Sequence, residues 1–108
     1  MALNVKYLYV VMMDVESDKE DLFNKTYDEE HIPILTKVPG VISAARYKTS
    51  DEGVARYLAI YELESPDVPH SEAFQKASDS GEWPTKLRPF CKNRSRIVYT
   101  QILPPPEK

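Results

Sequence analysis

The run from Val5 to Val15 constrains the fold of this chain more than any other stretch, because its two alternating sets of positions are both apolar. The odd positions hold Val5, Tyr7, Tyr9, Val11 and Met13, and the even positions hold Leu8, Val10 and Met12. This pattern predicts a strand that is buried on both faces of its sheet. The rest of the molecule must therefore cover two faces.

The segments that follow alternate between helix and strand patterns. Ser17 with Glu20 three residues later matches the capping-box pattern that begins a helix, and Pro39-Gly40 is a pattern that ends one. Apolar residues recur at helical spacing between these points and should form the inward face of the helix: Phe23, Tyr27, Ile34 and Val38. Further strands are expected over 41–49, 54–64 and 94–103, with a second helix over 71–80. The short polar link 50–53 contains glycine, so the second and third strands should form a hairpin.

This order predicts an α+β, ferredoxin-like βαββαβ domain over 1–103, with helices on one face of a four-stranded antiparallel sheet. Residues 104–108 are expected to form a flexible proline-rich tail. Two helices cover only one sheet face, and the other face is too apolar for a monomer. We expect a homodimer formed through that sheet face, with a barrel between the subunits. The alternative is a monomer with partly exposed tyrosines.

Composition excludes several functions. The net charge of -3 over 108 residues argues against nucleic acid and anionic membrane as partners. No apolar run is long enough for a membrane span, and the start lacks a signal-peptide pattern, so a cytoplasmic location is expected. The lone Cys91 is interpreted as a reduced thiol. An RNA-binding domain shares the element order, and 56–61 faintly resembles its aromatic motif, but a basic cluster is missing.

The segment Tyr27-Asp28-Glu29-Glu30-His31-Ile32-Pro33 holds the first candidate for chemistry. His31 could act as a general acid or base without a cofactor, and the neighbouring carboxylates should favour its charged form. Pro33 cannot donate an amide, so the helix should kink or split near His31, and Ile32 should leave helical geometry. The alternative is a plain helix end, with Pro33 opening a new short turn. The structural alternative is a histidine that packs the helix end.

Glu30 is the second catalytic candidate. It lies seven residues after Phe23 and four before Ile34, in the middle of the predicted inward stripe. A buried carboxylate needs a partner, which Arg46 or a tyrosine could provide. The alternative is that the helix has ended or turned by this point, which would leave Glu30 in solvent.

The chain resembles the EthD-like family of the dimeric α/β-barrel superfamily, through Tyr27 to Pro33 and through Val38-Pro39-Gly40-Val41 to Arg46-Tyr47. The resemblance implies a dimer with a pocket between helices and sheet for a hydrophobic, aromatic or polyketide-like molecule. Some relatives are cofactor-free lyases, cyclases or oxygenases. This chain departs from the family in having Tyr27 where tryptophan is common, which questions a family-specific chemical role.

We therefore expect a binder of hydrophobic small molecules that acts as a cofactor-independent lyase, cyclase, isomerase or oxygenase, or alternatively a non-catalytic ligand-binding or interaction dimer. The expected substrate-binding residues are Tyr27, Tyr9, Tyr61, Arg46 and Trp83. The strand tyrosines share odd parity, which could place them on one face, as a ligand wall or as core and interface. Trp83 could instead anchor its loop. His70 is expected in solvent, and no metal-ligand spacing is present.

Overall fold

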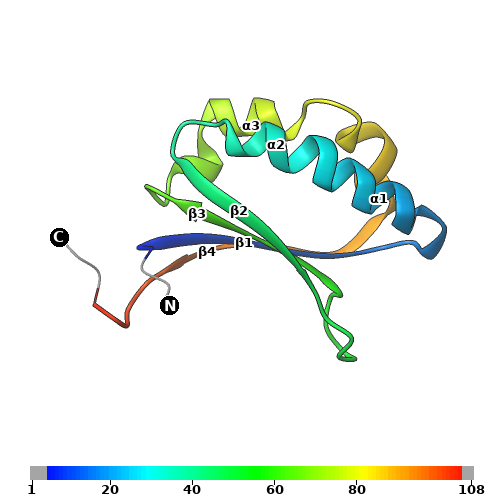
Figure 1. The fold of residues 1–108 in the computed structure, drawn as a ribbon, viewed down its shortest axis with the longest axis horizontal. Coiled ribbons are helices and arrows are strands. Elements are labelled where there is room, and N and C mark those ends of the chain that lie inside the picture. Colours follow the sequence, from blue (N-terminus) through cyan, green and yellow to red (C-terminus); the bar gives the residue numbers. More distant parts are fainter. Residues whose placement is uncertain (1–4, 106–108) are drawn as a thin grey trace.

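The computed structural model describes residues 5–105 and contains the predicted sheet. Within these residues, the antiparallel strands are β1 (Tyr7–Val15), β2 (Val41–Lys48), β3 (Tyr57–Leu63) and β4 (Cys91–Thr100). Their order across the sheet is β2-β3-β1-β4. The helices α1 (Glu20–Thr26), α2 (Ile32–Thr36) and α3 (Glu72–Ser78) lie on one face, and the other face is bare (Figure 1). The ferredoxin-like βαββαβ prediction is confirmed.

All four strands differ somewhat from the predicted bounds, β3 and β4 the most, and β4 ends at Thr100 rather than at residue 103. β4 begins at Cys91 rather than at residue 94, because a bulge next to Asn93, whose φ is 55°, lets the pairing with β1 continue through Lys92 and Cys91. β3 begins at Tyr57, after a turn in which the Thr49 amide donates to the Arg56 carbonyl. β2 and β3 pair directly across this turn, so the predicted hairpin is confirmed.

The register decides which tyrosines share a face. Tyr9 lies opposite Tyr61 on β3 and opposite Val98 on β4, and these residues face the helices. Tyr99 lies opposite Leu8 and is therefore on the uncovered face, where it is 49% exposed. The shared odd parity of the strand tyrosines, which left their faces open, does not put Tyr99 with the others, because odd positions of β4 pair with even positions of β1 over this stretch.

The first helical segment runs without interruption from Ser17 to Thr36 but changes its hydrogen-bond pattern three times. A 3₁₀ turn η1 (Ser17–Lys19) leads into α1, and a π-helical turn η2 (Tyr27–His31) joins α1 to α2. The Ile32 amide donates to the Tyr27 carbonyl, which closes the π turn just before Pro33. Ile32 itself stays helical, at φ -61° and ψ -48°, so the prediction that it leaves helical geometry is wrong. The wider turn takes up the lost amide bond without a break.

The π turn also changes which side chains face the sheet. In a regular α-helix the residue seven positions after Phe23 points the same way, and that residue is Glu30. One extra residue in the turn moves this position to His31. The buried stripe is accordingly Phe23, Tyr27, His31 and Leu35, whereas Glu30 is only partly buried.

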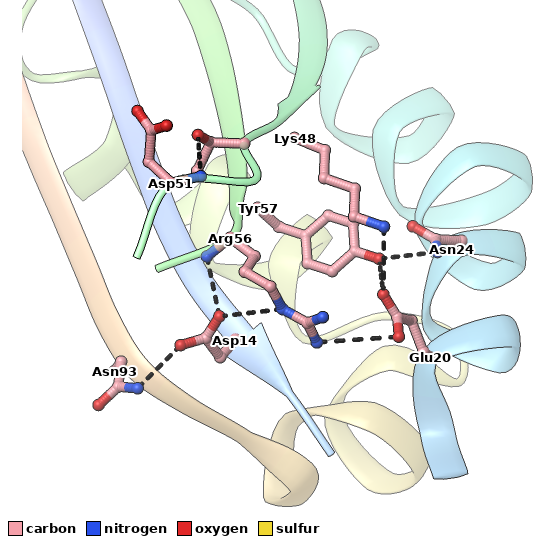
Figure 2. A network of polar contacts seen from close by, with 9 residues as sticks. Asp14, Glu20, Asn24, Lys48, Asp51, Arg56, Tyr57 and Asn93 are labelled. Atoms are coloured by element: carbon pink, nitrogen blue, oxygen red, sulfur yellow. Dashed lines mark hydrogen bonds and ion pairs between the residues drawn. The ribbon is translucent and has the colours of Figure 1, made fainter. Parts of the chain in front are cut away.

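The start of α1 is attached to the sheet by a polar network (Figure 2). The predicted capping box is wrong, because α1 has Lys19 at its N-cap and no side-chain cap. The Glu20 carboxylate instead accepts a hydrogen bond from the Tyr57 hydroxyl and lies 3.8 Å from Arg56 Nη2. These contacts lower the pKa of Glu20, the Tyr57 hydrogen bond most of all. Arg56 also donates its backbone amide to Asp14 at 2.8 Å.

No helix within residues 5–105 is long and apolar enough to cross a bilayer. The predictions that concern the first residues of the chain, and the tail from residue 106 onward, lie outside the described residues.

Candidate functional site

A small cavity lies between the helices and the sheet, with a volume of about 40 Å³. At roughly 10–15 Å³ per water of this kind of volume, it has room for about three waters. Its lining comes from α2, α3, the π turns at 27–31 and 83–87, and three strands, and comprises Tyr9, Val11, Met13, Tyr27, His31, Leu35, Tyr61, Phe74, Gln75, Ser78, Trp83, Arg94 and Arg96. The predicted residues Tyr9, Tyr27, His31, Tyr61 and Trp83 are therefore brought together in one place.

His31 forms part of the cavity wall and is only 4% exposed. Its ring stacks on Trp83, with centroids 4.7 Å apart, and meets the edge of Tyr27 at 5.0 Å. The buried Nδ1 atom has no hydrogen-bond partner in the described part of the chain. Burial, assisted by the nearby Arg88 guanidinium, lowers the pKa of His31 from 6.5 to about 4. The imidazole is therefore neutral near pH 7.

The expectation that neighbouring carboxylates favour a charged His31 is wrong. These carboxylates project away from the cavity: Asp28 forms an ion pair with Arg46 at 2.6 Å, and Glu30 accepts a hydrogen bond from the backbone amide of Glu82. Sequence neighbours on a helix point in different directions, so proximity along the chain does not bring the charges together. Loss of hydration then outweighs their attraction and keeps the imidazole neutral.

Trp83 is held by a second π-helical turn, η4 (Trp83–Leu87), and is 2% exposed. The turn that precedes it is fixed by the Glu30 carboxylate, which accepts from the Glu82 amide. Gly81 adopts a φ of +71°, and a Cβ atom there would overlap the same carboxylate. Glu30 thus lies outside the cavity, where it orients the segment that carries Trp83. Trp83 packs as a buried anchor against His31.

The tyrosines provide a polar edge within this aromatic wall. The hydroxyl oxygens of Tyr27 and Tyr61 are 3.4 Å apart, and the Tyr9 ring lies 5.9 Å from that of Tyr61. Burial raises the pKa of all three phenols. They are therefore neutral hydrogen-bonding groups near pH 7.

Arg46 lies outside the cavity, against the other side of the Tyr27 ring. Its guanidinium carbon is 4.5 Å from that ring's centroid, and its nitrogens bond Asp28 and Asn24 at 2.6 and 2.9 Å. Arg46 therefore packs and orients Tyr27 in this structure. Neither Arg46 nor Glu30 contacts the space in front of His31.

Sequence reasoning missed Arg94 and Arg96, which enter the cavity lining from β4. Their spacing of two residues is a signal that they share one face of a strand. That signal did not say which face, because the register between β4 and β1 was unknown. The register now places Arg96 opposite the buried Val11, on the helix-facing side.

A wider groove of about 490 Å³ adjoins the cavity, running between η3 (Val68–His70), α3 and β4. The groove and the cavity share three lining residues, Tyr9, Gln75 and Arg96. His70 lies in the groove and is exposed, as predicted. A molecule seated against His31 could therefore extend outward past Arg96.

The single cysteine has the features of an unreactive thiol. Cys91 Sγ donates to the Leu87 carbonyl at 3.3 Å, and burial raises the pKa of the thiol to about 11. A thiol with so high a pKa holds little of the reactive thiolate near pH 7.

Comparison with solved structures shows what the fold is similar to. A candidate antibiotic biosynthesis monooxygenase from Bordetella bronchiseptica matches with a TM-score of 0.72 at 17% identity, covering 92% of this chain and 99% of that one. An EthD family protein from Bacillus halodurans matches with a TM-score of 0.63 at 7% identity, covering 89% of this chain and 99% of that one. A dimeric ferredoxin-like protein from an uncultured marine organism matches with a TM-score of 0.64 at 22% identity, covering 90% of this chain and 94% of that one.

No family model and no curated relative matches the chain. Identities this low establish the fold alone. The chain has the ferredoxin-like fold of these proteins, and its resemblance to the EthD-like family is confirmed at the level of the fold.

Proposed function

We propose that this protein binds a small aromatic molecule in the cavity and acts on it by proton transfer through His31, without a cofactor. The reaction classes that fit are those that begin by removing a proton beside a carbonyl or from a phenol: isomerisation, cyclisation and elimination. Oxygenation belongs to the same group when dioxygen reacts with the resulting anion. The similarity in fold to a candidate monooxygenase agrees with this range.

The observation that carries the proposal is a buried, neutral imidazole with an unpartnered nitrogen in the wall of an aromatic cavity. A buried polar atom without a partner costs stability, so its retention calls for an explanation. A neutral imidazole can accept a proton from a substrate or hydrogen-bond to its oxygen. Negative charge developing on the substrate would raise the pKa of His31 from about 4 toward neutrality, which strengthens it as a base.

The surrounding residues have supporting roles in this proposal. The rings of Tyr9, Tyr27, Tyr61 and Trp83 would hold a flat substrate, and the paired hydroxyls of Tyr27 and Tyr61 could donate to its oxygen. Arg46 and Glu30 would act indirectly, Arg46 by orienting Tyr27 and Glu30 by orienting the segment that carries Trp83.

The proposal is tested by solvent isotope exchange on bound compounds. Small phenols and aromatic ketones would first be screened for binding by NMR line broadening. Binders would then be incubated in D₂O with wild-type protein, His31→Gln and Lys92→Gln, Lys92 being an exposed residue that lines neither the cavity nor the groove. Wild type and Lys92→Gln should catalyse deuterium incorporation beside the carbonyl, and His31→Gln should not. Equal exchange by His31→Gln would remove His31 from the mechanism.

We propose in addition that a second copy of the chain covers the bare sheet face. That face carries an apolar set of side chains: Leu8, Val10, Met12, Tyr47, Leu58, Ile60, Ile97 and Tyr99. Tyr47, Ile97 and Tyr99 are 58%, 42% and 49% exposed, and apolar side chains gathered on one face mark an interaction surface. One protein of similar fold is dimeric.

Light scattering after size-exclusion chromatography tests the dimer. Wild type should elute as a dimer, and Ile97→Glu should yield monomers because it buries a charge in the interface. Val54→Glu is the matched control, since Val54 is 58% exposed in the turn between β2 and β3. A monomeric wild-type protein would contradict the proposal.

A non-catalytic ligand-binding role is the second candidate, and the close stacking of Trp83 on His31 favours it. This contact leaves a cavity of only about 40 Å³, so a larger substrate has little access to the imidazole unless Trp83 moves. Native mass spectrometry of the purified protein distinguishes the two. A retained small molecule that undergoes no exchange in D₂O would support binding without chemistry.

A further inference from the structure

The rim of the cavity holds an excess of positive charge that the protein does not neutralise. Arg94 and Arg96 both line the cavity and are both exposed on β4. Within residues 5–105, neither takes part in an ion pair. Because the chain as a whole carries a net charge of -3, a local excess of positive charge is not a consequence of composition.

A third guanidinium lies close by. Arg88 contacts the Ser78 carbonyl at 3.2 Å and Asp79 at 2.9 Å, but its Nε atom is buried without a hydrogen-bond partner in the described chain. Partial burial, Arg96 and Arg88 together lower the pKa of Arg94. The charge of Arg88 is paired with Asp79, but Arg94 and Arg96 repel each other, and an anion placed between these two would relieve that repulsion.

We infer that the ligand of this cavity is an aromatic carboxylate, with its ring against His31 and Trp83 and its anionic group bound by Arg94 and Arg96. This inference rests on the proposed function, because it assumes that the cavity takes a ligand. The inner wall is aromatic and suits a ring once Trp83 has moved to enlarge the cavity of about 40 Å³, whereas the rim supplies planar guanidinium groups that suit a carboxylate. The adjoining groove leaves room for substituents beyond Arg96.

A carboxylate at the rim would also complete the electrostatics of the proposed chemistry. Burial, and after it the charge of Arg88, disfavours a proton on His31. A bound anion would offset the positive charge of the arginines and so favour protonation of the imidazole. Binding of an anionic ligand would thus turn a poor base into an effective one, whereas a neutral analogue would leave it poor.

Benzoate, benzamide and acetate separate the contributions of ring and charge. Benzamide has the size of benzoate without its charge, and acetate has the charge without the ring. Dissociation constants would be measured at low ionic strength by two-dimensional NMR, following the indole N–H of Trp83. The proteins are wild type, the double variant Arg94→Gln with Arg96→Gln, and Lys92→Gln. Lys92 is an exposed cation on the same strand that does not line the cavity.

Wild type and Lys92→Gln should bind benzoate about tenfold or more tighter than benzamide, the size of one charge-assisted hydrogen bond. The double variant should bind benzoate no better than benzamide. Equal binding of the two probes by wild type, or a benzoate preference that survives in the double variant, would overturn the inference while leaving an aromatic ligand site in place. Acetate binding as tight as benzoate would overturn it as well, since the ring would then be irrelevant. Failure of both aromatic probes to bind at millimolar concentration would overturn the inference together with the ligand site.

Discussion

Acid should destabilise the folded protein through His31 before most of its carboxylates begin to titrate. The pKa of this imidazole is lowered from 6.5 to about 4 in the folded chain. Between pH 6.5 and about pH 4, His31 binds a proton in the unfolded state but not in the folded state, so folding stability falls as the pH falls. The contribution of neutral His31 is fully present above pH 6.5, and it is lost progressively as the pH drops toward 4.

The size of the loss follows from the shift of about 2.5 pKa units, the difference between 6.5 and about 4. At 1.36 kcal/mol per unit, the folded protein loses about 3 kcal/mol across this window. A loss of this size is a substantial share of the ~5–15 kcal/mol that stabilises a typical domain. Below the lower value both states are protonated, and His31 contributes no further change.

Urea denaturation at a series of pH values measures this effect in wild type, His31→Gln and His70→Gln. The quantity of interest is the free energy of unfolding of wild type minus that of His31→Gln at each pH. The subtraction removes the contribution of carboxylates such as Asp14 and Glu20, whose lowered pKa values also weaken folding in acid. The difference should decline by about 3 kcal/mol from neutral pH to pH 4, and His70→Gln should follow wild type.

Two results would refute this reasoning. Parallel wild-type and His31→Gln curves would mean that His31 titrates alike in both states. An NMR titration in which the imidazole carbon protons of His31 shift with a midpoint near 6.5 would mean that the ring is hydrated or paired with a carboxylate. Either result would remove the neutral buried imidazole on which the proposed chemistry depends.

Three further changes test contacts around the site, each measured by chemical denaturation. Gly81→Ala should lower the free energy of unfolding by about 1–3 kcal/mol, because a positive φ and the Glu30 carboxylate both oppose a Cβ there. Gly53→Ala is the control, since its φ is also positive but its surroundings are open, and it should lower that free energy by less. Equal losses in the two variants would refute the close approach of Glu30 to Gly81. Tyr27→Phe should cost about 1 kcal/mol by leaving the Tyr61 hydroxyl unpaired, and an unchanged stability would mean that the hydroxyls do not interact. Glu20→Gln should be less stable than wild type above the carboxyl's ordinary pKa of 4.5, because wild type there gains from the charged Glu20. Wild type loses this gain as the pH falls, so the free energies of unfolding of the two proteins should converge in acid. A constant difference would show that the Glu20 charge is not stabilised.

The fold was predictable because local signals agreed with one another. The doubly apolar run that became β1 called for cover on both faces, and the polar link 50–53 set the hairpin of β2 and β3. Ser71 caps α3 by accepting a hydrogen bond from the Phe74 amide, as a serine at that position should. Each of these features depends on residues close together in the chain, which is the information that periodicity and turn chemistry contain.

The composition of the cavity rim was not predictable, because it depends on pairing between distant strands. Arg94 and Arg96 alternate like any strand residues, and either face of the sheet was open to them until β4 was registered against β1. The bulge beside Asn93 shifts that register by one residue near the end of the strand. A shift of one residue exchanges the two faces, so sequence parity alone could not assign the arginines to the cavity.

The choice between His31 and Glu30 depends on hydrogen bonds rather than on hydrophobic periodicity. Regular α-helical spacing from Phe23 favours Glu30 as the inward residue, and the π turn η2 transfers that position to His31. Pro33 lies directly after this turn, and Pro84 lies within the corresponding π turn that carries Trp83. A proline lacks the amide that a regular helix requires, so it favours a local change of hydrogen-bond pattern at both places. The stacked rings of His31 and Trp83 are thus both oriented by π turns next to prolines. At this helix, the proline that follows the histidine indicates the inward side chain better than the apolar periodicity does.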